Sequence, residues 1–150
     1  MAERGYTTRR SSIVNAIVEK LKDINGSGGY LADLNENISP RLKFWDEVEE
    51  FPAVHLNAGN ETREYQAGGY KDRFLSVTLR CYVQDDDSVK ALDELLEDVE
   101  TVLEENSRLP YTDRQGKTQY TQQITIVSID TDEGVLEPLG VGEMLIEVRY

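Results

Sequence analysis

Residues 73–83 give the clearest strand pattern in the chain, because apolar and polar side chains alternate along them. The apolar positions are Leu75, Val77, Leu79, Cys81 and Val83, and serine, threonine and arginine occupy positions between them. Successive side chains of a β-strand point to opposite faces, so this pattern predicts a strand with one buried face. Such a strand needs a second layer to cover its apolar side, and that layer must come from elsewhere in the chain.

Two segments carry the helical repeat instead. Residues 11–24 place apolar side chains at steps of three and four, with Thr8 or Ser11 available as an N-cap and a glycine-rich stretch at 26–29 to end the helix. Residues 88–106 carry a longer apolar stripe and follow three aspartates at 85–87, which supply a cap and a favourable charge. The economical architecture is α+β: a mainly antiparallel β-sheet with two amphipathic helices packed on one face.

The remaining segments carry weaker signals. Strands are predicted at residues 51–57, 124–130 and 141–150, while residues 30–50 predict a short strand or a covering segment. The polar residues 58–72 form a hairpin or a loop, and residues 110–122 a hairpin or a mobile loop. A chain of 150 residues has the size of one domain, which we expect to span residues 1–150, with residues 1–8 as a loose N-terminal arm.

The net charge of −13 limits the functions open to the chain. Gripping nucleic acid requires clustered lysine and arginine, so an acidic chain is a poor candidate for that role. Two interpretations of the charge remain. It is an ordinary solvated acidic surface, or it belongs to a surface that DNA passes without adhering.

The sequence predicts no export and no membrane insertion. The N-terminus lacks the apolar stretch of a signal peptide, and no run approaches the roughly 20 apolar residues of a membrane span. The single cysteine, Cys81, permits no internal disulfide and fits a reducing cytoplasm.

The residue types of common active sites are missing or misplaced. His55 alternates with apolar neighbours, which favours a packed or rim position over a catalytic or zinc-binding one. Residues 130–134 resemble the start of a calcium loop, but the glycine falls at the fifth position and Val141 at the twelfth, so a turn at a strand end is the better interpretation. No phosphate-binding loop or nucleophile elbow is present. We therefore predict no enzyme activity, catalytic residue, metal or cofactor.

Three short motifs stand in a distinctive order: EFP at residues 50–52, TDEGVL at 131–136 and VRY at 148–150. With the two helices placed before and between the strand segments, they make residues 10–150 resemble the tail terminator proteins of long-tailed, siphovirus-type bacteriophages. No single motif suffices; their order and spacing carry the resemblance.

The resemblance implies a structural protein of the virion, assembled in the host cytoplasm. Tail terminators cap the head-proximal end of the tail tube as a six-fold ring, stop its polymerisation and form the surface onto which the head docks. The implied partners are copies of the same chain, the tail tube protein and a head-completion or neck protein, while DNA passes through without specific binding. A head- or tail-completion protein and a small non-enzymatic binding module are the alternatives.

The resemblance and the residue types together suggest two surfaces. Tyrosine and arginine are enriched in interfaces, which favours one group of residues for contact with the tube or a neighbouring subunit: Arg63, Tyr65, Tyr70, Lys71, Arg73 and Tyr150. The outer face of the second helix offers one acidic set for the bore: Asp93, Glu94, Glu97, Asp98, Glu100 and Glu104. The acidic run at residues 46–50 is the other candidate for the bore.

Overall fold

The main sheet has five strands in the order β1-β2-β3-β7-β6 in the computed structural model, which describes residues 8–42 and 47–150. The predicted N-terminal arm, apart from Thr8, lies outside these residues. The strands are β1 (Ile38–Ser39), β2 (Ala53–Tyr65), β3 (Lys71–Gln84), β6 (Gln123–Thr131) and β7 (Leu139–Arg149). β1 pairs with β2 in parallel and every other pair is antiparallel.

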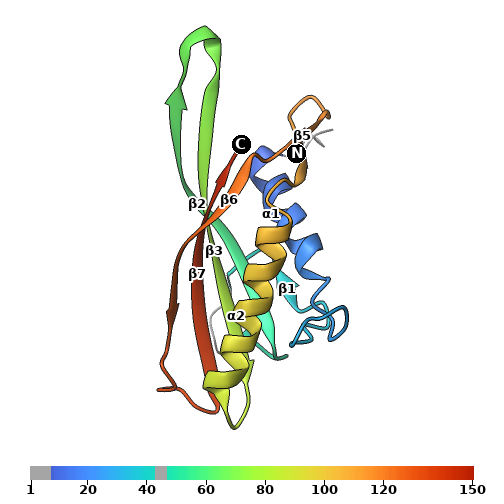
Figure 1. Ribbon diagram of the computed structural model, residues 1–150, viewed down its shortest axis with the longest axis vertical. Helices are drawn as coiled ribbons and strands as arrows, with labels where there is room; N and C mark the ends of the chain where they lie inside the picture. The colour runs from blue at the N-terminus through green and yellow to red at the C-terminus, as the bar shows by residue number, and fades with distance from the viewer. Residues whose placement is uncertain (1–7, 43–46) are drawn as a thin grey trace.

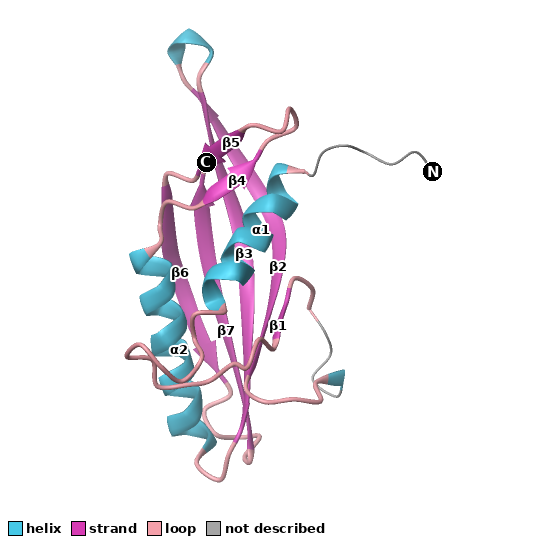
Figure 2. Ribbon diagram, turned by 90° about the vertical axis from the view of Figure 1, so that its right-hand side faces the viewer, coloured by secondary structure: helices cyan, strands magenta, loops and turns pink. Residues whose placement is uncertain are grey.

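Both helices, α1 (Arg9–Leu21) and α2 (Ser88–Glu105), cover the same face of this sheet (Figure 2). The Thr8 side chain accepts a hydrogen bond from the Ser11 backbone N–H at 3.1 Å and caps α1. Asp87 caps α2 in the same way through Lys90 N–H. The predicted α+β class with two helices on one face of a mainly antiparallel sheet is confirmed, although α1 begins and ends earlier than the sequence predicted.

The core lies between the helices and the inner face of the sheet. Its largest contributions come from one set of fully buried side chains: Ile13, Ile17, Leu21, Leu75, Leu79, Leu92, Leu95 and Leu103. Burying each of these side chains contributes about 1.5–3 kcal/mol relative to leaving it in water. Gly142 of β7 lets α2 approach closely, since a Cβ there would lie 3.1 Å from Leu92 Cδ1.

The β2–β3 hairpin extends well beyond the helices and forms one end of the molecule (Figure 1). Its pairing runs from Ala53 opposite Tyr82 to Tyr65 opposite Lys71, with a bulge between Ala58 and Glu61. The short 3₁₀ turn η2 (Ala67–Gly69) closes it. The segment 58–72, predicted as a hairpin or a loop, is therefore a hairpin, and the strand predicted at 51–57 continues to Tyr65.

Two shorter segments complete the fold. β4 (Pro110–Thr112) pairs with β5 (Thr118–Tyr120) in a small hairpin. Residues 110–122, predicted as a hairpin or a mobile loop, therefore contain a hairpin. Its turn is held by Asp113, whose Oδ1 accepts hydrogen bonds from Gln115 N–H and Lys117 N–H, both at 2.9 Å. These bonds with Lys117 and Gln115, and a third from a glutamine side chain, hold the pKa of Asp113 below its usual range despite desolvation.

Candidate assembly surfaces

The projecting part of the β2–β3 hairpin, residues 58–72, is called the hairpin arm below. Tyr65 and Tyr70 near its tip are 73% and 75% exposed, and Lys71 Nζ lies 5.7 Å from the centre of the Tyr65 ring. The arm stands clear of the helices, so the body of the chain does not bury these rings (Figure 1). Exposed tyrosines are typical of protein–protein contact surfaces.

The root of the arm is a packed polar cluster. The Tyr150 hydroxyl donates a hydrogen bond to Glu61, and Arg63 Nε donates to the other Glu61 carboxylate oxygen at 2.9 Å. The Arg73 guanidinium lies 5.5 Å from the centre of the Tyr150 ring. Of the six predicted interface residues, the structure thus places Arg63, Arg73 and Tyr150 at the root and the other three near the tip.

These contacts perturb the ionisation of the cluster. Desolvation alone would raise the pKa of Glu61, but the hydrogen bonds from Tyr150 and Arg63, with the charges of Arg63 and Arg10, hold it below its ordinary value. Burial, together with the hydrogen bond to Glu61, raises the pKa of Tyr150. Glu61 is therefore the anion and Tyr150 the neutral donor over the whole physiological pH range.

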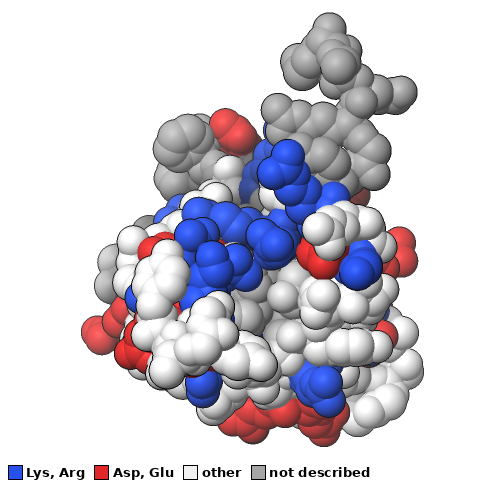
Figure 3. All heavy atoms as spheres, turned by 90° about the horizontal axis from the view of Figure 1, so that it is seen from above, with Lys and Arg blue, Asp and Glu red and all other residues white. Residues whose placement is uncertain are grey.

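Three further arginines gather at the same root, and sequence reasoning missed them as site residues. Arg9 and Arg10 begin α1 and Arg114 lies in the β4–β5 turn; with Arg63 and Arg73 they line a cavity of about 270 Å³, called the arginine pocket below. Figure 3 shows lysine and arginine side chains gathered on this end of the molecule. The residues come from four separate segments, so no local sequence pattern reveals the pocket.

The outer side of α2 is acidic, as the sequence predicted, with one exception. Asp93, Glu97 and Glu104 are exposed, and Glu94 and Glu100 are partly exposed. Asp93, Glu97, Glu100 and Glu104 follow one another at steps of three or four residues and form one row along the helix, and Glu94 lies beside that row. All five therefore share the solvent-facing side of the helix. We call these five residues the acidic stripe.

Asp98 is the exception, and its prediction as an outward-facing bore residue is wrong. Asp98 is only 3% exposed. The two carboxylate oxygens accept hydrogen bonds from Leu31 N–H at 2.9 and 3.1 Å and from Ala32 N–H at 2.7 Å. Asp98 therefore anchors the segment after α1 to α2 and is not available to line a bore.

The second candidate for the bore, residues 46–50, is described only in part. Asp46 lies outside the described residues, while Glu47, Glu49 and Glu50 are exposed. They form one side of a concavity of about 370 Å³ next to β1 and β2. Both acidic regions thus face solvent, and neither is engaged by an ion pair that the structure shows.

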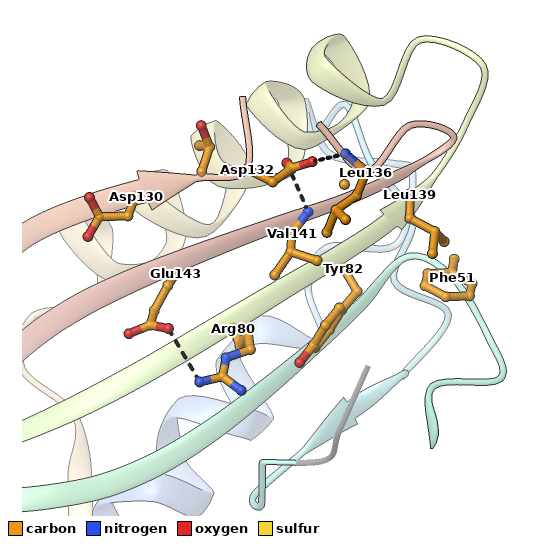
Figure 4. A pocket seen from close by; sticks show the side chains of 11 residues that line it. Phe51, Arg80, Tyr82, Asp130, Asp132, Leu136, Leu139, Val141 and Glu143 are labelled. Carbon is orange, nitrogen blue, oxygen red and sulfur yellow. Dashed lines mark hydrogen bonds and ion pairs between the residues drawn. The ribbon is translucent and has the colours of Figure 1, made fainter. Parts of the chain in front are cut away.

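A mostly apolar groove of about 610 Å³ lies on the face of the sheet that the helices leave uncovered (Figure 4). Phe51, Tyr82, Leu136, Leu139 and Val141 contribute its apolar lining. An ion pair between an arginine of β3 and a glutamate of β7 lies at its side, with 3.3 Å between the charged atoms. Sequence reasoning did not identify this groove, because its lining comes from three distant segments.

The loop beside the groove is held by Asp132. Its Oδ1 accepts a hydrogen bond from Val141 N–H at 3.2 Å, and Oδ2 accepts one from Leu136 N–H at 3.1 Å. Glu133 and Gly134 both have positive φ, at 56° and 83°, which gives the chain its sharp reversal after β6. The predicted turn at a strand end is confirmed, and Asp132 is a structural residue of that turn.

His55 is 4% exposed and its ring centre lies 5.1 Å from that of Tyr82, so the predicted packed position is confirmed. Among the residues that the structure describes, no three or more histidine, cysteine, aspartate or glutamate side chains are grouped as for a metal ion. In the same part of the chain, no helix is both long and apolar enough to cross a membrane.

A solved structure contains a chain with a similar fold. A solved structure described as the virion of a native gene transfer agent particle contains a chain that superimposes with a TM-score of 0.58 at 6% identity, covering 96% of this chain and 98% of that one. At such low identity the likeness concerns the fold alone.

Two sequence comparisons go further than the fold. The chain is 33% identical over 150 residues to the tail tube terminator protein p142 of Escherichia phage T5, covering 94% of this chain and 92% of that protein. The model of the family described as bacteriophage tail tube terminator protein matches residues 7–150. The chain therefore belongs to the bacteriophage tail tube terminator family.

Proposed function

We propose that this protein caps the head-proximal end of the phage tail tube as a closed ring of six copies, ends tube polymerisation, and presents the surface to which the head or neck docks. Membership of the family makes it a structural component of the phage tail. The proposal needs no catalytic step. One ring face binds the last tube ring, and the opposite face lacks the surface that recruits another, so growth stops.

The hairpin arm is the observation that carries the proposal. A closed head-to-tail ring requires two different contact surfaces on each copy, and binding a tube requires a further one. The arm extends beyond the body and ends in two exposed tyrosines, whose rings are not buried within one copy. We assign Tyr65, Tyr70 and Lys71 near its tip to contact with the tube.

The bore is assigned to the acidic stripe of α2. Carboxylates repel DNA phosphates, so a bore lined by them conducts DNA without holding it. The stripe is the longer of the two acidic surfaces and lies on a rigid helix, which favours it over residues 47–50. Without Asp98, five of the six predicted residues remain available for this role: Asp93, Glu94, Glu97, Glu100 and Glu104.

The proposal is tested with a phage that lacks the protein and is complemented by variants. Tyr65→Ser combined with Tyr70→Ser should give overlong tubes without heads, as complete absence should. Tyr120→Ser is the matched control, because that tyrosine is 51% exposed but lies on β5 and away from the arm. Electron microscopy of tail lengths decides the result.

Other outcomes have distinct meanings. Tails of normal length that fail to join heads would assign the arm to the head side and the protein to neck completion. If the Tyr65→Ser/Tyr70→Ser variant and the Tyr120→Ser control both restore normal infectious particles, the proposed role of the arm is contradicted. Normal particles in the complete absence of the protein would contradict the terminator function.

A further inference from the structure

The end of the molecule opposite the hairpin arm is formed by two neighbouring turns, residues 84–88 and 132–138 (Figure 1). A backbone hydrogen bond of 2.9 Å, from Asp85 N–H to a carbonyl oxygen of the second turn, joins them. The apolar groove opens beside these turns, because Tyr82 in its lining lies eleven residues along β3 from Lys71 of the arm. That separation is about 35 Å along an extended strand, so the groove and the arm belong to different ends of the molecule.

Apolar side chains are exposed at the end that carries the groove. Val135 and Leu136 in the turn after β6 are 82% and 48% exposed, and Val89 at the start of α2 is 43% exposed. Val89 lies against the same turn, since a Cβ added to Gly134 would stand 3.0 Å from Val89 Cγ2. Leu136 also lines the groove, so the exposed turn and the groove adjoin. Exposed apolar surface next to a groove is typical of a site that binds another protein.

Carboxylates surround this apolar surface. Residues 84–90 and 130–138, called the acidic end below, contain seven aspartates and glutamates against one lysine. In the lining of the groove, three carboxylates stand against one guanidinium, that of Arg80, which pairs with Glu143 at 3.3 Å. The lining therefore carries two negative charges in excess. Asp130 is exposed beside the groove, and the described residues include no cation that forms an ion pair with it.

The fold uses only part of this acidic and apolar set. Asp132 holds its turn through two backbone hydrogen bonds, and Asp87 caps α2. The carboxylate of Asp130 accepts no hydrogen bond from the part of the chain that the structure describes, and the side chain of Leu136 is about half exposed. Burying an apolar side chain against a partner is favourable, so Asp130 and Leu136 are available for binding rather than occupied by the fold.

We infer that the acidic end is the docking surface for the head side, and that the groove receives a segment of the head or neck protein in which an apolar side chain is flanked by lysine or arginine. The inference rests on the proposed function, because the arm that we assign to the tube lies at the other end. The apolar side chain of the partner fills the groove, and its cations face Asp130 and the other carboxylates beside it (Figure 4).

The distribution of charge between the two ends identifies this occupant. Lysine and arginine gather at the end that carries the arm (Figure 3), whereas carboxylates dominate the acidic end. Opposite charges steer partners together and like charges reject the wrong ones, so the two ends select different partners. A second copy could bring its basic end to this acidic end, but that contact would add ring upon ring and extend the assembly. A cap that ends growth therefore requires a different protein at this surface.

The test complements a phage that lacks the protein and scores tail length and head joining by electron microscopy. Leu136→Ser removes an apolar contact of the groove, and Asp130→Lys reverses a charge beside it. Leu31→Ser and Asp23→Lys are the matched controls, because both residues are exposed and lie between α1 and β1. Each groove variant should give tails of normal length with head joining lowered at least about tenfold, while the controls behave like the wild type. Circular dichroism of the purified variants confirms that each is folded.

A second measurement tests the charge of the partner. DNA-filled heads from the phage that lacks the protein are treated with an acetylating reagent for lysine and with phenylglyoxal for arginine, and their shape is checked by electron microscopy. Treated heads should join wild-type tails as poorly as untreated heads join Asp130→Lys tails. Combining treated heads with Asp130→Lys tails should cause no further loss, because both changes remove the same attraction.

Each remaining outcome overturns the inference in a different way. If complete absence of the protein leaves normal particles, the proposed function fails and the docking surface fails with it. If absence gives overlong tubes but both groove variants join heads like their controls, the function stands and the acidic end does not bind the head side. Overlong tubes from the groove variants would make this surface a contact with the tube or a second copy instead. Equal joining of treated and untreated heads would rule out a cationic partner segment.

Discussion

Replacing Asp98 with asparagine should destabilise the fold by about 2–3 kcal/mol. Asparagine keeps the shape of the side chain but has one acceptor oxygen, and its NH₂ group would face a backbone N–H. With the amide oxygen in the place of Oδ2, the hydrogen bonds from Leu31 N–H and Ala32 N–H both remain, but each loses the assistance of the charge, at about 1 kcal/mol per bond. The amide NH₂ group takes the place of Oδ1, 3.1 Å from the Leu31 nitrogen, where two donors face each other, and this adds up to about 1 kcal/mol.

Urea denaturation followed by far-ultraviolet circular dichroism measures this change. Asp98→Asn should lower the urea midpoint without changing the slope, and should lower the Tm by roughly 5–10 °C for a chain of this size. Asp93→Asn is the matched control on the exposed side of the same helix and should stay within about 0.5 kcal/mol of the wild type. Equal midpoints for the two variants would refute the anchoring role of the buried carboxylate.

Three further predictions concern the rest of the fold. Because the fold lowers the pKa of Glu61, the contribution of this carboxylate to stability is complete above about pH 4.5 and is lost as the pH falls through the folded pKa. Glu61→Gln should therefore flatten this part of the curve of unfolding free energy against pH. A curve unchanged by the substitution would contradict the stabilising role of the Glu61 carboxylate. Burial raises the pKa of Cys81 to about 12, so a thiol reagent at pH 8 should label it no faster than the protein unfolds, and rapid labelling of the native state would argue against this burial. Gly140→Ala would place a Cβ 2.7 Å from Val83 Cγ2 and should cost about 1–3 kcal/mol in urea denaturation, whereas Gly59→Ala, with only a backbone oxygen at 3.9 Å, should cost clearly less; equal losses would refute the packing argument.

Local periodicity predicted the helices and the central strand because those segments bury one face each. The alternation along residues 73–83 follows directly from burial under α2 and α1. The end of β2 was misplaced for the opposite reason. Residues 62–65 stand clear of the body, so both of their faces meet solvent and no hydrophobic pattern is needed, while pairing with β3 supplies their backbone hydrogen bonds.

The error at Asp98 could have been avoided from the sequence. Asp98 lies three residues after Leu95 and four before Val102, which places it on the apolar side of the helix. A buried aspartate then demands donors, and the structure supplies them from residues 31 and 32. Which segment would supply those donors could not be predicted, since the two are more than 60 residues apart.

The arginine pocket shows a stricter limit of sequence reasoning. Arg10 and Gly59, which are hydrogen-bonded at its edge, are 49 residues apart, and Arg73 and Tyr150 meet only because β3 and β7 are neighbours. Composition alone indicates an acidic surface, because a net charge of −13 conceals the local excess of arginine at this pocket. Only the fold reveals such an excess, since a mean over the chain contains no information on where charges meet.

This separation of charge bears directly on how one surface could bind protein while another rejects DNA. At physiological salt, charges in solvent act over a Debye length of only about 8 Å, so repulsion by the acidic stripe is confined to DNA that passes close to α2. Tyrosine contacts such as those proposed at the tip of the arm carry no net charge, so salt does not screen them in this way. Binding at the tip of the arm and repulsion along α2 can therefore coexist in one small chain. Under the proposed function, raising the salt concentration should weaken DNA repulsion before it releases the tube.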